Sequence, residues 1–252
     1  LAVEGDGYDA AHFEAQWWTQ FDDPVLDALV EATLGNNRDL AVAYGRLRAA
    51  RAHRDDAAND AYPVVGALAS GELRHAQQPG ASEQRVRTQR YDLGLDMAWE
   101  IDLFGRLQRQ LEARDAHAES LAADLAHLQV SLVAELVSAY GELRGAQLRQ
   151  RIALQNRDAQ RRSVRLIQQL HEGGLRETLE LLRSQALLAA TEARIPLLQA
   201  AEARARHRIL TLTGQRADDA PFDLGARALP AIARPLRIGE LRELLRRRPD
   251  VA

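Results

Sequence analysis

Residues 91–104 read YDLGLDMAWEIDLF, and apolar side chains alternate with small or acidic ones along this stretch. The apolar set is Tyr91, Leu93, Leu95, Met97, Trp99, Ile101 and Leu103. The other set includes the acidic residues Asp92, Asp96, Glu100 and Asp102. Because successive side chains of a β-strand point to opposite faces, this alternation predicts a strand with one apolar face and one polar face.

The predicted strand has the length of a membrane-spanning strand. At about 3.3 Å per residue, residues 91–103 extend over about 43 Å, and a tilt of about 45° reduces the height to about 30 Å, the thickness of a bilayer's hydrocarbon core. An isolated alternating run is more often a half-buried strand of a soluble sheet. The surrounding sequence must therefore decide between the two interpretations.

A second strand is predicted just before the first. Residues 64–73 are small and compatible with a strand, and residues 75–90 form a polar loop with Pro79-Gly80 at its tip, so we expect a hairpin with a long loop. A lone two-stranded hairpin cannot bury a face by itself, and its open edges are not tolerated in lipid. We therefore expect other strands to complete the sheet, which disfavours the soluble interpretation.

Helices are predicted on the N-terminal side of the hairpin. Asp23-Pro24 marks the start of a first helix and Gly35-Asn36 its end, while Asn37 is a good cap for a second helix over residues 38–60. The rings of Trp17, Trp18 and Phe21 are expected to anchor the polar segment that precedes them.

A long helical pair is predicted on the C-terminal side. Residues 105–171 contain no proline and carry apolar residues at steps of three and four, which predicts a helix of about 100 Å. Gly173-Gly174 is the predicted turn, and residues 175–213 form a returning helix in which Pro196 should cause a kink or local loosening. The returning helix is shorter than the helix over residues 105–171, and the helix over residues 38–60 has nearly the length of this difference. The two shorter helices stacked end to end would therefore match the long one.

Composition excludes several classes of function. The chain has 252 residues with 46% hydrophobic residues, as in ordinary folded proteins. It has no cysteine, so disulfides, thiol nucleophiles and cysteine metal sites are excluded. The net charge of -3 gives no excess of basic residues for binding nucleic acid. The sequence contains no uninterrupted apolar run of 18 residues, so it predicts no transmembrane helix.

Catalytic motifs are also missing. The 7 histidines form no HExxH or other metal-ligand spacing, and neither a phosphate-binding loop nor a GxSxG motif occurs. We therefore expect no enzyme activity, no metal and no cofactor.

The sequence divides into four segments: residues 1–62, an N-terminal arm with the upper helices; 63–104, the β-hairpin; 105–213, the long helical hairpin; and 214–252, a linker and the start of a second repeat. The repeat is suggested by a short match near the two ends. It aligns Val30, Leu34, Asp39, Leu40 and Ala41 with Leu241, Leu245, Asp250, Val251 and Ala252.

Several short motifs are shared with one known family. They are Trp17-Trp18 with Phe21-Asp22-Asp23-Pro24, Asn37-Arg38-Asp39-Leu40, residues 99–106 (WEIDLFGR), Ala139-Tyr140 with Leu143-Arg144, Gly173-Gly174-Leu175, Leu212-Thr213-Gly214, and residues 244–251 (LLRRRPDV). On these motifs, which extend over nearly the whole chain, the sequence resembles the N-terminal repeat of outer membrane factors of the TolC and OprM type. These proteins are the exit ducts of tripartite efflux pumps and type I secretion systems.

The resemblance implies a mainly α fold with one β-hairpin. A long antiparallel helical hairpin would form part of an α-barrel wall, and the two strands would join a shared transmembrane β-barrel. The implied location is the outer membrane of a Gram-negative envelope, with an extension into the periplasm. The implied partners are further copies in a homotrimer of the full-length protein, a periplasmic adaptor protein, an inner-membrane transporter and outer membrane lipid.

The resemblance also implies roles for particular residues. Gly173, Gly174 and Leu175 match the helical tip that contacts the adaptor, and Glu180 falls where relatives commonly carry an aspartate at the periplasmic constriction. The apolar set of residues 91–103 would face lipid, and Asp92, Asp96, Glu100 and Asp102 would face the lumen. The chain departs from the family at Glu177, where a serine is frequent, and in having no N-terminal cysteine for a lipid anchor.

An alternative from another class is a soluble coiled-coil scaffold without channel activity. In that case the helical hairpin would be the functional part, and the strands would pair with a partner protein. The unbroken alternation of residues 91–103 argues against this alternative.

Overall fold

The computed structural model describes residues 8–9, 16–76, 86–216, 222–230 and 236–237. The chain forms two compact units, residues 1–44 with 123–252 and residues 45–122. Two helices contribute to both units: α2 (Arg38–Asn59) and the 67-residue α3 (Arg106–Glu172).

The first unit begins with the predicted aromatic anchor. Trp17–Phe21 forms a 3-10 helix, η1, and the ring of Trp17 makes edge-on contacts with the rings of Trp18 and Phe21 at centroid distances of 6.3 and 6.4 Å. Helix α1 (Pro24–Asn36) follows. The Asp23 side chain caps it by accepting hydrogen bonds from the backbone N–H groups of Val25 (2.9 Å) and Leu26 (3.4 Å).

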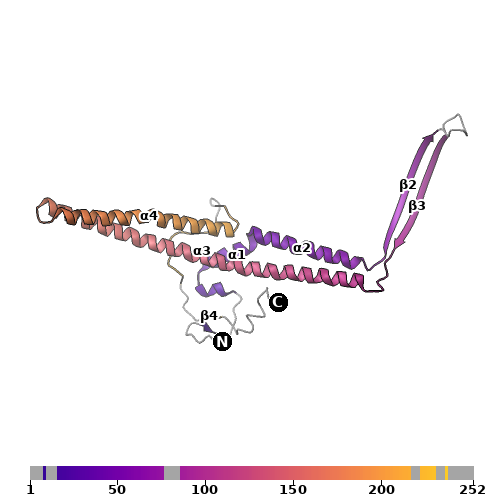
Figure 1. The fold of residues 1–252 in the computed structure, drawn as a ribbon, viewed down its shortest axis with the longest axis horizontal. Coiled ribbons are helices and arrows are strands. Elements are labelled where there is room, and N and C mark those ends of the chain that lie inside the picture. Colours follow the sequence, from indigo (N-terminus) through magenta and orange to yellow (C-terminus); the bar gives the residue numbers. More distant parts are fainter. Residues whose placement is uncertain (1–7, 10–15, 77–85, 217–221, 231–235, 238–252) are drawn as a thin grey trace. The chain divides into compact units, whose positions relative to one another are not determined.

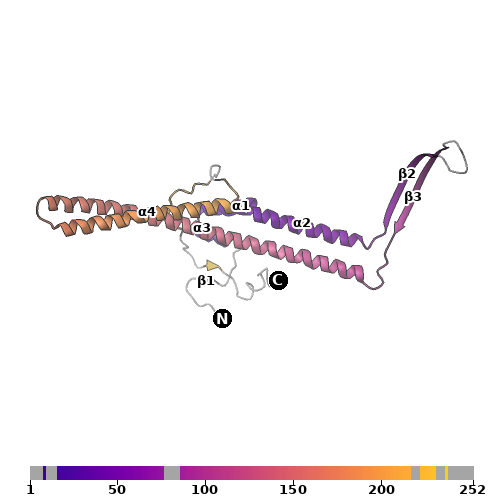
Figure 2. The same ribbon diagram turned by 45° about the horizontal axis from the view of Figure 1, so that its top comes forward.

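The helical hairpin of this unit consists of α3 and α4 (Thr178–Leu212), which run side by side in both ribbon views (Figures 1 and 2). Two ion pairs join them, Arg161 with Glu192 at 2.7 Å and Arg208 with Glu135 at 3.1 Å. Helix α4 continues through Pro196, where the ring removes one helical hydrogen-bond donor. It begins three residues later than predicted, because Leu175 N–H still bonds back to the carbonyl of Leu170 (2.8 Å) in the turn.

The buried core lies where α1, α3 and α4 contribute apolar side chains. Its members include Leu26, Leu29, Val30, Leu136, Ala139, Leu143 and Ile209. Their spacing along each helix follows the three- and four-residue steps of a helical face, and this pattern allowed the helices to be predicted.

The end of α4 meets the start of α2, as predicted for end-to-end stacking. Asn37 caps α2 by accepting from Asp39 N–H (2.9 Å) and Leu40 N–H (3.2 Å), and its side-chain amide donates to the carbonyl of Leu212 (2.9 Å). Gly214 has φ +67°, and a Cβ there would lie 2.5 Å from the Asn36 carbonyl oxygen. Only glycine fits this junction, which we call the end-to-end joint.

A short parallel strand pair also belongs to this unit. Residues Tyr8–Asp9 (β1) pair with Leu236–Arg237 (β4). The sequence predicted no strand at either place, because two residues are too few to produce an alternating pattern. The helix expected from residue 238 onwards and the aligned repeat at residues 241–252 lie outside the described residues.

The second unit contains the strand hairpin. Strand β2 (Val64–Ala76) pairs antiparallel with β3 (Val86–Ala98), from Val64 opposite Ala98 to Ala76 opposite Val86. The same unit holds the later part of α2 beside the first part of α3, where Arg54 and Asp115 form an ion pair at 2.7 Å.

The predicted hairpin was correct in kind but wrong in its bounds. Strand β3 ends at Ala98, so Trp99, Glu100, Ile101, Asp102 and Leu103 lie outside it. The next position of β2 is Pro63, which has no N–H to continue the ladder. At the other end the ladder runs on to Ala76 and Val86, because backbone pairing does not require apolar side chains, and the predicted loop 75–90 was too long.

One described helix, α3, contains an 18-residue window with a mean hydropathy of 1.3, which is apolar enough to cross a membrane by length and composition alone. The sequence argument missed it because polar residues interrupt the apolar run. A core helix meets the same criterion, and α3 buries Leu132, Val133 and Leu136.

Candidate functional site

Four features of the described residues are candidates for function: the two faces of the β2–β3 hairpin, the base of that hairpin, the tip of the α3–α4 hairpin, and a buried polar network. Among the described residues, no cluster of histidines and carboxylates has the arrangement to hold a metal ion.

The register of β2 and β3 places apolar side chains on one face of the hairpin. Tyr91, Leu93, Leu95 and Met97 stand opposite Gly71, Ala69, Ala67 and Val65. All four β3 side chains are exposed, from 69% for Met97 to 89% for Leu93. Large apolar side chains with this exposure leave an unpartnered surface, which is unfavourable in water.

The opposite face of the hairpin carries the acidic side chains of β3, together with the exposed Val64 and Leu68 of β2. Asp96 stands opposite Gly66, where a Cβ would lie 2.7 Å from Asp96 Oδ1, so the glycine makes room for the carboxylate. Asp92 accepts hydrogen bonds from Arg90 Nε (3.2 Å) and Ser70 Oγ (3.4 Å). The predicted separation of Asp92 and Asp96 from the apolar set is therefore confirmed within the ladder.

The base of the hairpin is held by polar contacts. Trp99 Nε1 donates to the carbonyl of Ala61 (3.1 Å), and Arg106 Nη2 donates to both carboxylate oxygens of Glu100 (2.8 Å each). Asp102 accepts from Gln108 N–H (3.0 Å) in the first turn of α3. Glu100 and Asp102 thus have local structural partners that the sequence did not predict.

The tip of the α3–α4 hairpin is a tight turn. Gly174 has φ +72°, Gly173 N–H bonds to the carbonyl of Gln169 (3.0 Å), and Leu175 N–H bonds to that of Leu170 (2.8 Å). This is the glycine-dependent helix ending expected from Gly173-Gly174. His171 Nδ1 donates to the carbonyl of Arg176 (2.8 Å), which ties the last turn of α3 to the start of α4.

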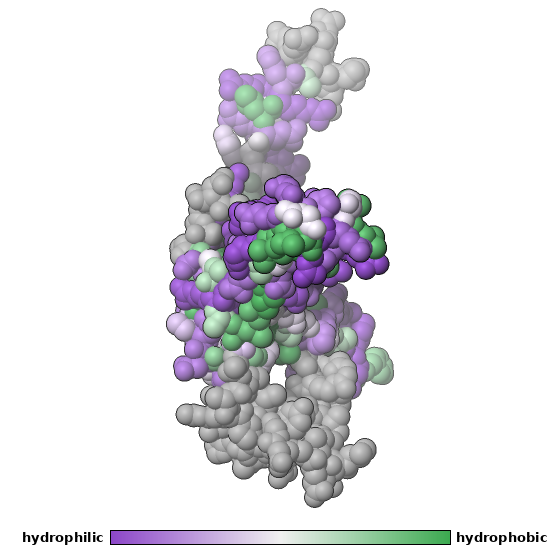
Figure 3. All heavy atoms as spheres, turned by 90° about the vertical axis from the view of Figure 1, so that its left-hand side faces the viewer, coloured by the Kyte–Doolittle hydropathy of each residue, from purple (hydrophilic) through white to green (hydrophobic). Residues whose placement is uncertain are grey.

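Apolar side chains are exposed at this tip. Leu175 is 73% exposed, and Leu179 and Leu182 follow at helical spacing with more than half of their surface exposed. Figure 3, viewed from the end of the molecule that carries the tip, shows hydrophobic surface bordered by hydrophilic surface. The predicted contact residues therefore lie on an accessible surface.

Glu180 lies in the first turn of α4, six residues after Gly174. Both of its carboxylate oxygens accept from Arg176 Nη1 at 3.0 Å. A carboxylate in the first turn of a helix is also favoured by the helix dipole. Glu180 is thus locally balanced in charge, while its side chain remains 43% exposed.

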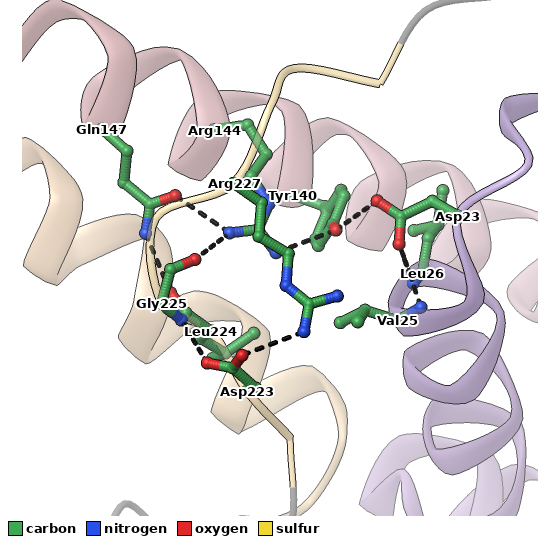
Figure 4. A network of polar contacts seen from close by, with 10 residues as sticks. All are labelled: Asp23, Val25, Leu26, Tyr140, Arg144, Gln147, Asp223, Leu224, Gly225 and Arg227. Atoms are coloured by element: carbon green, nitrogen blue, oxygen red, sulfur yellow. Dashed lines mark hydrogen bonds and ion pairs between the residues drawn. The ribbon is translucent and has the colours of Figure 1, made fainter.

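A buried polar network centres on Arg144, whose side chain is completely buried (Figure 4). Its Nη2 donates to the hydroxyl of Tyr140 (2.9 Å), and its Nη1 donates to Gln147 Oε1 (2.9 Å) and to the carbonyl of Gly225. The Tyr140 hydroxyl in turn donates to Asp23 Oδ2 (2.5 Å). The charge of Arg144 is therefore balanced by Asp23 through the tyrosine.

The same network holds residues 222–230 against the helices. Gln147 Nε2 donates to the carbonyl of Leu224 (2.8 Å) and to Glu202 of α4 (3.3 Å). Asp223 accepts from Gly225 N–H (2.9 Å) and Arg227 (2.9 Å), and these contacts lower the pKa of Asp223. We call the linked residues Asp23, Tyr140, Arg144 and Gln147 the arginine clamp.

Sequence reasoning assigned no role to the arginine clamp, although Asp23, Tyr140 and Arg144 all lie in the shared motifs. A signal was present, because Arg144 stands beside Leu143 in the apolar stripe of α3 and one helical turn after Tyr140. A charged residue on a buried face requires a partner. The partner lies 121 residues away in Asp23, and no local pattern could identify it.

Comparison with known proteins defines the class. The family described as outer membrane efflux protein matches residues 29–215, and the chain therefore belongs to this family. The predicted resemblance, the mainly α fold with one β-hairpin, and the location in the outer membrane are confirmed. The family is one of outer membrane efflux proteins, and the similar OprN structure is that of an outer-membrane channel.

Individual relatives cover most of this chain. It is 58% identical to the structure of the outer-membrane channel OprN, with a TM-score of 0.86 over 98% of this chain and 55% of that one. It is 30% identical to the pyoverdine export outer membrane protein OpmQ of Pseudomonas aeruginosa, over 94% of this chain and 51% of the relative. It is 27% identical to nodulation protein T of Rhizobium leguminosarum bv. trifolii, over 93% and 50%. The chain thus spans about half the length of the curated relatives it matches.

The arginine clamp generates a prediction for Tyr140. Burial raises the pKa of Tyr140 to about 12, the bond to Asp23 adds to the rise, and Arg144 opposes it. The folded-state pKa exceeds the ordinary value of 10.0, so this stabilisation is complete below pH 10 and is lost as the pH rises towards 12. Tyr140→Phe should lower the free energy of unfolding by about 1–3 kcal/mol at neutral pH and should remove this alkaline loss, measured by thermal unfolding over pH.

Tyr44→Phe is the matched control, because the Tyr44 hydroxyl accepts one exposed bond from Gln129 (3.1 Å). We expect it to change stability by less than about 0.5 kcal/mol. Equal losses for the two variants would contradict a special role of the clamp.

Proposed function

We propose that this chain supplies the first of two repeats in each subunit of a passive outer membrane exit channel. The channel would serve a tripartite efflux or type I secretion system. The observation that carries the proposal is the unpartnered apolar face of the β2–β3 hairpin, in a chain that belongs to an outer membrane family.

In this proposal the hairpin contributes two strands to a shared transmembrane barrel. Leu93, Leu95 and Met97 face lipid, where their exposure is favourable, and Asp92 and Asp96 face the aqueous lumen. The open edges of β2 and β3 pair with strands of further copies or of the second repeat, because unpaired backbone is not tolerated in lipid. A homotrimer supplies those strands.

The barrel proposal predicts that a charge reduces membrane insertion at one residue of β3 and has no effect at its neighbour. Leu95→Arg places a charge on the lipid face, where it should cost about 2–4 kcal/mol, so less protein should be found in the outer membrane. Gly94→Arg places the same charge on the polar face, where a Cβ meets no atom within 4 Å, and should insert normally. The test is outer membrane fractionation of cells that express the full-length protein. Equal insertion of the two variants would contradict the membrane orientation.

The tip of the α3–α4 hairpin is proposed to dock a periplasmic adaptor protein, which in turn connects to an inner-membrane transporter. The support is the exposure of Leu175 on a turn that Gly173, Gly174 and the His171 bond hold in one conformation. Exposed apolar surface bordered by polar residues is typical of protein interaction sites.

For the tip we expect Leu175→Asp to abolish copurification of the adaptor, because it places a charge at the centre of an apolar contact. Leu175→Met should retain copurification, since it keeps an apolar side chain of similar size. Both variants should reach the outer membrane in normal amounts. Adaptor capture by Leu175→Asp at the level of the unchanged protein would exclude this contact.

Glu180 is proposed to line the periplasmic constriction. The carboxylate is exposed and lies near the tip, and it is paired with Arg176, which precedes α4. Opening or closing of the channel would then involve exchange of this ion pair with polar groups of the second repeat.

If Glu180 lines the pore, Glu180→Gln removes a charge there and frees Arg176, so single-channel recordings in planar bilayers should show lower cation preference. Glu177→Gln removes an equivalent charge three residues away and should leave the preference unchanged. Since charges more than about 10 Å from the ion path are screened at 0.1 M salt, the recordings are made at that ionic strength, so that only charges close to the path affect the selectivity. Identical selectivity of the two variants would place Glu180 outside the pore.

A further inference from the structure

Two basic side chains lie at the far end of the β2–β3 hairpin, on the same face as the apolar residues of β3. Arg87 stands directly opposite His75 in the antiparallel ladder, and both side chains are exposed. Gln89 is the next residue of β3 on this face and is also exposed. All three residues belong to the unit of residues 45–122, and we call them the basic rim.

The face that carries the basic rim has no carboxylate within the ladder. Besides the rim, the register places these residues on it: Val65, Ala67, Ala69, Gly71, Leu73, Tyr91, Leu93, Leu95 and Met97. The acidic residues of the ladder all lie on the other face, and they are Glu72, Asp92 and Asp96. The charge of Arg87 is therefore not balanced on its own face.

The arginines of the other face have acidic neighbours. Arg90 Nε donates to Asp92 Oδ1 (3.2 Å), and Arg90 stands opposite Glu72. Arg74 lies two residues after Glu72 on the same face. Within the part of the chain that the structure describes, neither of the two basic side chains of the rim has such a partner. Their donor groups are therefore available to a ligand.

The geometry of the basic rim suits an anion with several oxygens. Residues directly opposite each other in an antiparallel pair have Cβ atoms about 4.5–5.5 Å apart, so Arg87 and His75 can donate to the same group. A guanidinium presents a planar fork of donors that matches phosphate oxygens. The ring N–H of His75 and the amide of Gln89 supply further donors. Both strands thus offer donors to one phosphate group.

The depth of the basic rim matches the margin of a membrane. The apolar face begins at the pair of Val65 and Met97, and Arg87 lies ten positions from Met97 along β3. Ten residues extend over about 34 Å, or about 24 Å in height at a tilt of about 45°. The apolar band of an outer membrane barrel is about 25 Å tall. The rim therefore lies at the level where lipid headgroups begin, at the end of the hairpin away from the helices.

The position of the basic rim favours lipid over protein as its partner. In a barrel, neighbouring strands pair through the backbone edges of β2 and β3, and this pairing leaves the apolar face to lipid. An arginine at the end of such a face keeps its stem along apolar surface and its charged head in the polar layer. Anionic lipid attracts each such arginine.

We infer that the basic rim binds phosphate groups of lipid headgroups in the outer leaflet, which is the leaflet away from the helices. This inference rests on the proposed membrane role of the hairpin. It assigns recognition of a charged ligand to one end of a face that is otherwise apolar, and it separates Arg87 from Arg74, which lies at the same end of the hairpin but on the other face.

The test measures binding of lipid A, a phosphorylated glycolipid, to the full-length protein purified in detergent from the outer membrane. Diphosphoryl lipid A is the ligand, and monophosphoryl lipid A, which lacks one phosphate, is its matched control. Native mass spectrometry counts the bound lipid over a range of lipid concentrations. Arg87→Gln removes the charge of the rim, and Arg74→Gln removes an exposed arginine of the other face.

We expect Arg87→Gln to bind diphosphoryl lipid A about fivefold more weakly than the unchanged protein, the effect of one arginine at an anionic lipid surface. Arg74→Gln should bind as tightly as the unchanged protein, which should itself prefer the diphosphoryl lipid. His75→Phe keeps an aromatic ring but removes the ring N–H, and it should also weaken binding. This variant replaces Arg87→Gln should the latter fail to assemble.

Unchanged affinity after loss of the Arg87 charge, or equal losses in Arg87→Gln and Arg74→Gln, would overturn the inference and leave the membrane hairpin intact. Equal binding of the two lipids by the unchanged protein would also overturn it, because the rim would then not recognise phosphate. Absence of the unchanged full-length protein from the outer membrane fraction would instead refute the membrane hairpin itself.

Discussion

The first unit depends on the burial of one positive charge. An uncompensated guanidinium in an apolar core is strongly unfavourable, so Arg144 requires partners on every side. Its ring contact with Tyr140 is close, with Cζ 4.6 Å from the ring centroid, but its Nε has no partner among the described residues. The surrounding chain supplies the rest: α1 through Asp23, α3 through Tyr140 and Gln147, and the segment after α4 through Gly225. Packing these parts together is therefore a condition for burying the charge.

How much could be predicted depended on whether the signal was local. Helix ends were predicted correctly where a capping residue marks them, as at Asp23 and Asn37, because a cap acts over only two or three positions. The end of β3 was predicted wrongly because side-chain alternation continues through Trp99 and Ile101, whereas the backbone ladder stops opposite Pro63. The alternation of side chains indicates which surroundings each residue faces, whereas backbone hydrogen bonding defines where the strand ends.

The candidate sites also differ in whether a local pattern in the sequence indicates them. The apolar and polar faces of β3 could be predicted from period alone, and the register confirmed them. Trp99, Ile101 and Leu103 continue the alternation of the sequence and were therefore assigned to the strand, although β3 ends at Ala98. The arginine clamp and the end-to-end joint could not be predicted from local patterns, since Asp23 and Tyr140 are 117 residues apart and Asn37 and Leu212 are 175 apart. Residues of the arginine clamp and of the end-to-end joint lie in motifs shared with the family, but the motifs did not indicate which contacts these residues make.

The end-to-end joint has a mechanical consequence. Helix α3 has an unbroken hydrogen-bond ladder, so bending it requires straining many backbone bonds at once. Among the described residues, the hydrogen bond from the Asn37 amide to Leu212 and the close approach of Gly214 to Asn36 join the end of α4 to the start of α2. The joint between α4 and α2 thus lies beside a continuous helix. Rotation of α4 at the joint breaks the Asn37 hydrogen bond and also disturbs the buried packing of Ile209 and the Arg208–Glu135 ion pair with α3.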